Sequence, residues 1–117
     1  MEPSFNTLLN DNAVNAPYYG AIVDEYTAGL YSDKDFLTQT LNDHFATWIT
    51  EDDFKQMAAA GLNHARLPIP YWAFPDLIGS APYVAGNRFD VLKQACGWAK
   101  NHGVKVWIDL HGVPGSQ

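Results

Sequence analysis

Residues 104–111 read Val-Lys-Val-Trp-Ile-Asp-Leu-His, and the sequence continues as Gly-Val-Pro-Gly-Ser-Gln through residue 117. Apolar side chains recur at every second position from Val104 to Leu110, which is the period of a β-strand. Asp109 and His111 fall on the opposite face, near the carboxyl end of the strand. In parallel α/β proteins, the loops after the strands hold the functional groups. The run therefore predicts a strand that delivers polar side chains to a functional loop.

A second strand is predicted over residues 62–67, which read Leu-Asn-His-Ala-Arg-Leu. We expect Pro68 and Pro70 to end it, because proline cannot donate a hydrogen bond to a neighbouring strand. A long loop over 71–86 and a helix over 88–102 follow. Loops of this length inside compact domains are usually functional. A strand, a helix and another strand form a βαβ unit, so the two strands are predicted to be parallel.

The segment before this unit is predicted to be a loop followed by two helices. Residues 1–20 are rich in Asn, Pro, Ser and Tyr and show no periodicity, so we interpret them as loop. Apolar side chains at helical spacing predict a helix over 34–47. Thr50 followed by three acidic residues is a typical helix start, and Gly61 is a typical end. Two strands are too few to close a parallel sheet, so the pattern predicts part of a larger α/β fold.

The composition favours a globular chain and argues against two classes of function. With 117 residues, 47% of them hydrophobic, the chain is long enough for one domain. Seven Lys and Arg against thirteen Asp and Glu give a net charge of -6, which disfavours binding to nucleic acid. No apolar run reaches the roughly 18 residues of a membrane span. Cys96 is the single cysteine, so no internal disulfide is expected, and its apolar helical surroundings predict a buried thiol.

Four polar side chains are expected to share one face of the sheet near the carboxyl ends of the strands. His64 and Arg66 alternate with other residues in the first strand, as Asp109 and His111 do in the second. An inward arginine is costly unless it is paired, so its partners should be carboxylates or ligand hydroxyls. Arg66 and His111 are the candidates for ligand contacts, with an ion pair between Arg66 and Asp109 as the structural alternative. We interpret Asp109 as an orienting group and His64 as a structural histidine.

Aromatic residues make up 14% of the sequence, and a surplus of aromatic residues often lines binding clefts. Trp72 and Phe74, in the loop after the first strand, are interpreted either as packing or as cleft-lining groups, and Trp107 as part of the core. The sequence contains no ligand pair at metal-site spacing, no glycine-rich nucleotide loop and no serine elbow. Neither a metal nor another cofactor is therefore expected.

Three segments resemble one family of proteins: residues 48–54 (WITEDDF), 63–74 (NHARLPIPYWAF) and 103–117 (GVKVWIDLHGVPGSQ). They are similar to the fungal exo-β-1,3-glucanases of glycoside hydrolase family 5, whose catalytic domains are (β/α)8 TIM barrels. The resemblance covers about residues 20–117. It implies an α/β fold in which residues 1–117 are the N-terminal part of a single barrel domain, roughly its first three βα units without the first strand.

The resemblance also implies roles for individual residues. Arg66 matches an arginine that keeps the nucleophilic carboxylate ionised, as a nearby positive charge does. His111 matches a histidine that binds hydroxyls of the non-reducing glucose. Glu2 falls in the remnant of a Leu-Glu-Pro motif, within a weaker match at the start of the chain, and matches a glutamate that binds the same sugar. Trp72 and Phe74 are the candidate aromatic contacts to the substrate.

By the same resemblance, the acid/base and nucleophilic glutamates of a retaining mechanism lie beyond Gln117, so the isolated chain is predicted to be inactive. Two parallel strands leave edges and apolar faces uncovered, so the chain is also predicted to be poorly soluble when it is expressed alone. The parent is expected to release glucose from β-1,3-glucan. It is expected to be monomeric, to use no cofactor, and to be extracellular or held in the cell wall. Two alternatives stay open: an endo-β-1,4-glucanase of the same family, and a non-catalytic glucan-binding or vestigial product.

Overall fold

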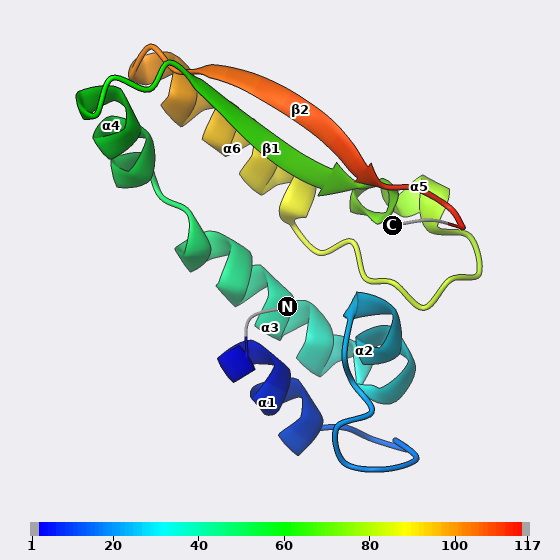
Figure 1. The fold of residues 1–117 in the computed structure, drawn as a ribbon. Coiled ribbons are helices and arrows are strands. Elements are labelled where there is room, and N and C mark those ends of the chain that lie inside the picture. The colour runs from blue at the N-terminus through cyan, green and yellow to red at the C-terminus, as the bar shows by residue number, and fades with distance from the viewer. Residues whose placement is uncertain (1–2, 116–117) are drawn as a thin grey trace.

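The computed structural model describes residues 3–115, with side chains from residue 5 onward. Figure 1 shows two strands lying against helix α6, with α4 at one end and the long helix α3 leading to the N-terminal helices. The molecule is elongated, 48 × 28 × 22 Å along its principal axes. In chain order the elements are α1 (Pro3–Asp11), α2 (Glu25–Tyr31), α3 (Lys34–Trp48), α4 (Glu51–Ala59), β1 (His64–Pro70), η1 (Tyr71–Ala73), α5 (Pro75–Ile78), α6 (Arg88–Asn101) and β2 (Lys105–Gly112).

Strands β1 and β2 pair in parallel, as the βαβ pattern predicts, and the fold combines helices with this small sheet. Helix α6 lies between the two strands in the sequence. Arg66 is opposite Trp107, and Pro68 is opposite Asp109. Residues opposite each other in a pair, and residues two apart in a strand, point to the same side of the sheet. Arg66 and Asp109 therefore share one face.

Strand β1 runs further than predicted, because Pro68 does not end it. The amide of Lys105 donates to the carbonyl of Asn63 over 2.9 Å, and residues of a strand alternate in facing a given neighbour. Pro68 therefore turns its backbone nitrogen away from β2 and removes no hydrogen bond from the β1–β2 ladder. The strand ends at Pro70, after a shift of register between Ile69 and Pro70.

The apolar face of the sheet packs on helices α4 and α6. The buried centre of this cluster consists of Phe54, Ala95, Ala99 and Val104, flanked by half-buried hydrophobic side chains from both strands. Phe54 is fully buried, and burial of a phenylalanine side chain stabilises a fold by about 2 kcal/mol. The alternation predicted for the two strands is confirmed where these helices cover them.

Three expectations of burial are corrected by the structure. Trp107 was expected in the core but is 74% exposed, because it lies on the polar face of β2 together with Asp109. Ile108 and Leu110 lie on the apolar face, yet they are 53% and 56% exposed, since α6 covers β2 only in part. Cys96 is a free, half-buried thiol rather than a fully buried one.

Helix α1, Pro3–Asp11, lies where the sequence pattern predicted loop. Leu9 is fully buried in a second core cluster that includes Ile22 and Leu41. Asn10 holds the returning chain: its side-chain amide donates to the carbonyl of Ile22 over 2.8 Å, and its side-chain oxygen accepts from the Ile22 amide over 3.1 Å. Tertiary packing therefore stabilises a short helix that the local sequence alone does not specify.

Helices α3 and α4 follow the prediction closely. Helix α3 begins after Asp33, whose carboxylate accepts two backbone amides. Helix α4 begins after Thr50, and Asp53 completes a capping box by accepting the Thr50 amide over 2.7 Å. Gly61 follows the last turn with φ +82°, a left-handed conformation that suits glycine. Helix α2 was not predicted from the sequence, and it begins with a capping box between Asp24 and Thr27.

The predicted loop over 71–86 contains two short helical segments, η1 and α5. The rest of the loop is anchored to α3, because Oδ1 of Asn42 accepts from the amide of Asn87 over 2.8 Å. Gly86 precedes this contact with φ +57°, and a Cβ atom there would lie 2.6 Å from the same Asn42 oxygen. The positive φ favours glycine at this position, and a Cβ atom there would also displace the Asn42 oxygen from its contact with Asn87.

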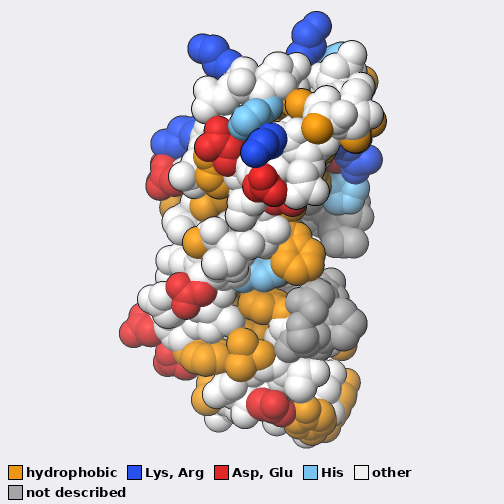
Figure 2. All heavy atoms as spheres, turned by 90° about the vertical axis from the view of Figure 1, so that its left-hand side faces the viewer, with side chains coloured by type: hydrophobic (Ala, Val, Ile, Leu, Met, Phe, Trp, Pro, Cys, Tyr) orange, Lys and Arg blue, Asp and Glu red, His pale blue; other side chains and the backbone are white. Residues whose placement is uncertain are grey.

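The surface differs between the two ends of the molecule. Figure 2 shows Lys and Arg side chains gathered over the end that holds α4, α6 and the strands, whereas Asp, Glu and hydrophobic side chains dominate the other end of this face. Exposed large hydrophobic residues include Tyr18 and Tyr19, at 67% and 72%. Within the described residues, no helix combines the length and apolar character needed to span a bilayer.

Candidate functional site

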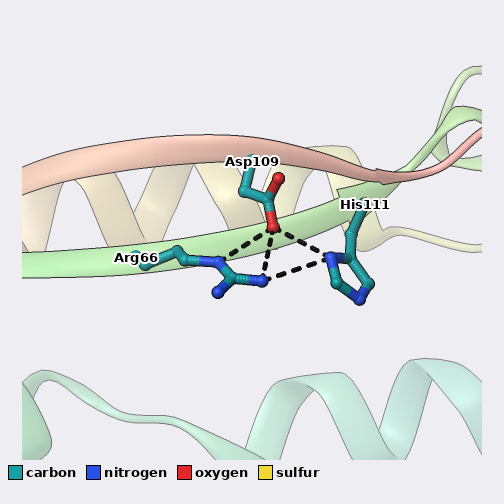
Figure 3. Close-up of polar contacts among 3 residues, drawn as sticks. All are labelled: Arg66, Asp109 and His111. Carbon is teal, nitrogen blue, oxygen red and sulfur yellow. Dashed lines mark hydrogen bonds and ion pairs between the residues drawn. The ribbon is translucent and has the colours of Figure 1, made fainter.

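Arg66, Asp109 and His111 meet toward the carboxyl ends of the strands, and we call them the strand-end cluster (Figure 3). Oδ2 of Asp109 accepts from Nε of Arg66 over 2.9 Å and lies 2.8 Å from Nη2 of the same guanidinium. The same oxygen lies 3.0 Å from Nδ1 of His111, and Nη2 of Arg66 lies 3.2 Å from that ring nitrogen. The structure thus brings together three of the four polar residues that the alternation placed on this face.

The register of the strands explains why these side chains meet. Asp109 lies opposite Pro68, which is two residues beyond Arg66 in β1. Two residues advance a strand by about 7 Å and return to the same face, a distance that the long arginine side chain can span. His111 follows Asp109 by one more pleat. Each side chain is therefore positioned by a strand rather than by a loop.

The cluster stabilises the ionised form of Asp109. Partial desolvation raises the pKa of this carboxyl group, but the hydrogen bonds from Arg66 and His111 and their positive charge outweigh it, so the pKa lies below its ordinary value of 3.8. The side chains of Arg66 and His111 are 62% and 58% exposed. Ion pairs at such exposure contribute little to folding. The cluster is therefore better suited to meeting a ligand than to holding the fold.

A groove of about 550 Å³ opens beside the strand-end cluster, lined by residues of β1, α3 and α6. Volumes of roughly 300–1,000 Å³ are typical of small-ligand sites. Arg66 and His111 line it together with a set of apolar side chains: Phe45, Trp48, Ile49, Leu67, Ile69, Trp72, Val91 and Leu92. Charged donors beside apolar and aromatic surface suit a ligand that has both hydroxyl groups and apolar faces.

A second polar cluster, which we call the junction, consists of Glu25, Trp72 and Arg88. Oε2 of Glu25 accepts from Nη2 of Arg88 over 2.7 Å and from the indole nitrogen of Trp72 over 2.8 Å. Oε1 of Glu25 accepts from Nη1 of Arg88 over 3.3 Å. The guanidinium of Arg88 lies 4.6 Å from the centre of the Phe45 ring. These contacts connect α2, η1, α6 and α3.

The junction is a site that the sequence patterns did not predict. One signal was present: Arg88 opens helix α6, where the helix dipole favours acidic residues, so a buried basic residue there needs a partner. That partner, Glu25, lies 63 positions away in the sequence, and no local pattern links the two residues.

Trp72 lies within both features, since it belongs to the junction and also lines the groove. It is only 8% exposed, and its ring stacks on Tyr83 with a centroid distance of 3.9 Å and an interplanar angle of 4°. Burial, with smaller effects of Tyr71, Asp24 and Glu25, raises the pKa of the Tyr83 hydroxyl. One face of the indole is therefore covered by protein, which leaves its edge for the groove.

Phe74 and His64 do not join the strand-end cluster in the described structure. Phe74 packs against Phe89 with a centroid distance of 5.1 Å. Nδ1 of His64 lies 2.8 Å from Oδ1 of its neighbour Asn63. Glu2 lies outside the described residues. In the part of the chain that the structure describes, no group of three or more His, Cys, Asp or Glu side chains is arranged to hold a metal ion.

Comparisons with known proteins give close relatives, although no family model matches the chain. A glucan 1,3-beta-glucosidase of Kluyveromyces lactis is 46% identical over 108 residues, which are 92% of this chain and 23% of the relative. The glucan 1,3-beta-glucosidase 2 of Wickerhamomyces anomalus is 50% identical over 95 residues, 81% of this chain and 22% of the relative. A probable glucan 1,3-beta-glucosidase A of Aspergillus fumigatus is 44% identical over 117 residues, 100% of this chain and 26% of the relative.

These relatives are all named glucan 1,3-beta-glucosidases, and each match covers most of this chain. The chain spans about a quarter of the length of the curated relatives it matches. The segments that carry the resemblance in the sequence include β1, β2 and the start of α4, which build the sheet, its apolar cover and the strand-end cluster. The resemblance is thereby confirmed, and the chain is a homologue of one part of the fungal glucan 1,3-beta-glucosidases.

Proposed function

We propose that the chain is part of the catalytic domain of a retaining exo-β-1,3-glucan glucohydrolase. The observation that carries the proposal is the convergence of Arg66 and His111, from neighbouring parallel strands, onto one groove. The similarity to glucan 1,3-beta-glucosidases over 81–100% of the chain supports the same reading. A parallel βαβ unit with polar groups toward its carboxyl ends is also the local geometry of a (β/α)8 barrel, so we assign residues 1–117 to the N-terminal part of one such domain.

Arg66 is proposed to keep a nucleophilic carboxylate ionised. Its Nε and Nη2 atoms contact Asp109, whereas Nη1 has no partner among the described residues and is free to face a further acceptor. A positive charge beside a carboxyl group lowers its pKa and favours the anion that attacks the sugar. The acid/base and nucleophilic glutamates, which a retaining mechanism holds about 5–5.5 Å apart, are expected from the remainder of the domain.

His111 is proposed to bind hydroxyls of the terminal glucose, with Glu2 as a second contact at the start of the chain. Trp72 and Phe74 are the proposed aromatic contacts, of which Trp72 already lines the groove. No cofactor enters the proposal. The whole protein is proposed to act as a monomer on β-glucan outside the cell or in the cell wall, in keeping with a polysaccharide substrate.

A chimeric enzyme tests the proposal. Residues 1–117 of this chain replace the segment that they match along their full length in the Aspergillus fumigatus relative. We expect the chimera to release glucose from laminarin from the first minutes, with retention of the anomeric configuration. Arg66→Ala and His111→Ala are expected to lower kcat/KM by roughly 100-fold or more, as the loss of a group that stabilises charge does.

The exposed His64, on the same face of the strand but outside the cluster, provides the matched control: His64→Ala should leave kcat/KM unchanged. A folded chimera that hydrolyses laminarin equally well without the Arg66 guanidinium would contradict the assigned role. Release of mixed oligosaccharides from a β-1,4-glucan, in place of glucose from laminarin, would favour an endo-acting enzyme. A folded chimera that binds but never cleaves glucan would favour the binding alternative.

A further inference from the structure

The imidazole of His111 lies between a hydrogen-bond acceptor, Asp109, and a hydrogen-bond donor, Arg66. Its Nδ1 atom is 3.0 Å from Oδ2 of Asp109 and 3.2 Å from Nη2 of Arg66. An ionised carboxylate only accepts hydrogen bonds, and a guanidinium only donates them. Nδ1 can therefore donate to Asp109 or accept from Arg66, but it cannot do both. The tautomer of the neutral ring depends on which neighbour prevails.

The contacts favour Asp109. The carboxylate oxygen is the nearer neighbour, and a bare Nδ1 would turn its lone pair toward an anion only 3.0 Å away. A proton on Nδ1 replaces this repulsion with a charge-assisted hydrogen bond. Arg66 loses little in this arrangement, because its side chain is 62% exposed to water and its Nε still donates to Asp109 over 2.9 Å.

We propose that Asp109 is a positioning residue that fixes the His111 proton on Nδ1 and so presents Nε2 to the groove as a bare acceptor. Figure 3 shows the second ring nitrogen directed away from Asp109 and Arg66, and His111 lines the groove. In the described part of the chain, Nε2 has no hydrogen-bond partner of its own.

The arrangement defines the chemistry that this corner of the groove recognises. It offers one neutral acceptor, Nε2 of His111, and one charged donor, Nη1 of Arg66. Nε2 can accept from a hydroxyl of the ligand, and Nη1, which Figure 3 shows on the side of the guanidinium away from His111, can donate to another hydroxyl of the same ligand. The ligand class is thus a neutral polyol or sugar. The identification of these hydroxyls with those of a glucan rests on the proposed function, whereas the tautomer does not.

Nitrogen-15 NMR of the histidine rings tests the tautomer directly. Two-bond proton–nitrogen correlations distinguish a protonated ring nitrogen from a bare one, and a His111→Gln variant identifies the signal among the four histidines. The spectra are recorded near pH 9, well above the ordinary imidazole pKa of about 6.5. His102 is an internal reference, because its Nε2 lies 3.1 Å from Oε1 of Glu51 and is expected to carry the proton.

We expect His111 to carry its proton on Nδ1 in the unsubstituted chain and in Arg66→Ala, and on Nε2 in Asp109→Ala, where only the arginine donor is left. Finding the proton on Nε2 in the unsubstituted chain, or no change in Asp109→Ala, would overturn the proposal. The same spectra are recorded on the histidine-labelled chimera. Its amide spectrum shows whether each variant is folded, so a change of tautomer is distinguished from unfolding.

A titration with laminaribiose separates this inference from the proposed function. We expect the sugar to move the Nε2 resonance of His111, and Asp109→Ala to weaken binding up to about tenfold, the equivalent of one hydrogen bond. A proton on Nδ1 without any response to the sugar supports the positioning role and counts against the glucan site. Sugar binding with the proton on Nε2 would overturn the positioning role of Asp109 and support the glucan site.

Discussion

The junction and the strand-end cluster each contain an arginine paired with a carboxylate, in two different environments. Arg88 in the junction is 8% exposed, whereas Arg66 in the cluster is 62% exposed. Both oxygens of Glu25 accept hydrogen bonds from protein groups. Among the described residues, the hydrogen bonds and ion pairs of Asp109 all fall on Oδ2. Burial therefore makes one pair a structural link, and exposure leaves the other with atoms that can meet a ligand.

The two regions also differ in how many elements depend on them. The junction connects α2 to η1 and α6, so the N-terminal helices keep their place through Glu25. The strand-end cluster connects β1 only to β2, which the backbone ladder already pairs. We expect loss of the junction to lower the free energy of unfolding, and loss of the strand-end cluster to weaken ligand binding. The predictions below test this division, from the largest effect to the smallest.

Removing the junction carboxylate is expected to have the largest effect. Glu25→Ala leaves the buried Arg88 without its partner, so we expect the free energy of unfolding to fall by about 3 kcal/mol. Glu25→Gln, which keeps an acceptor for Trp72, should lose less. Urea denaturation of the chimera measures both, with Asp109→Ala as the matched control that should shift the midpoint far less, because the ion pair of Asp109 is exposed. Equal shifts of the urea midpoint for Glu25→Ala and Asp109→Ala would contradict the view that the junction stabilises the fold and the strand-end cluster does not.

The close packing around the junction predicts the next effect. A Cβ atom on Gly29 of α2 would lie 1.9 Å from the carbonyl oxygen of Pro82, so Gly29→Ala must displace the helix or the loop. We expect a loss of about 2 kcal/mol in the free energy of unfolding. Gly97 of α6 is the control, since a Cβ atom there meets nothing within 4 Å, and Gly97→Ala should be neutral or stabilising. A neutral Gly29→Ala would show that α2 is loosely held.

Trp72→Phe is expected to have a smaller effect. Phenylalanine keeps a ring against Tyr83 but loses the indole donor to Glu25, which should cost about 1–2 kcal/mol. Trp107→Phe, at a position that is 74% exposed, should leave the urea midpoint unchanged. If Trp107→Phe lowered the urea midpoint and Trp72→Phe did not, the hydrogen bond from the Trp72 indole to Glu25 would contribute nothing to stability.

Titration of Asp109 gives the smallest effect and the sharpest view of the cluster. The pKa of its carboxyl group is expected below 3.8, and Arg66→Ala should raise it, because the hydrogen bond and the charge of the guanidinium are lost. A carboxyl group with a lowered folded-state pKa stabilises the fold above the unfolded pKa, and this contribution disappears as the pH falls through the folded pKa. Carboxyl carbon NMR measures the value, and a pKa above 3.8 in the unsubstituted chain would contradict the contacts described.

Parts of the fold follow from short-range patterns. Alternation with period two predicted β1 and β2, and a single helix between them predicted their parallel pairing, which the structure confirms. Thr50 followed by acidic residues marked the start of α4. These features depend on residues within a few positions of one another, so local steric and hydrogen-bonding rules are enough to identify them.

Other parts depend on partners that are remote in the sequence. Helix α1 has no local signal and is held by Leu9 against Ile22 and its neighbours. The strand-end cluster was predicted as a group, because alternation places Arg66, Asp109 and His111 on one face. Its hydrogen bonds, and the competition for Nδ1, emerge only from the register of the two strands.

The amino-acid sequence is therefore sufficient to identify the βαβ unit, the face that carries its polar residues and the relationship to glucan glucosidases. Which arginine is buried and which is available follows only from the packing of the folded chain. That choice depends on how α2, α3 and α6 come together around Glu25 and Arg88, which lie 63 positions apart. Burial is a property of the packed whole, so two identical charged side chains acquire opposite roles that no local pattern can separate.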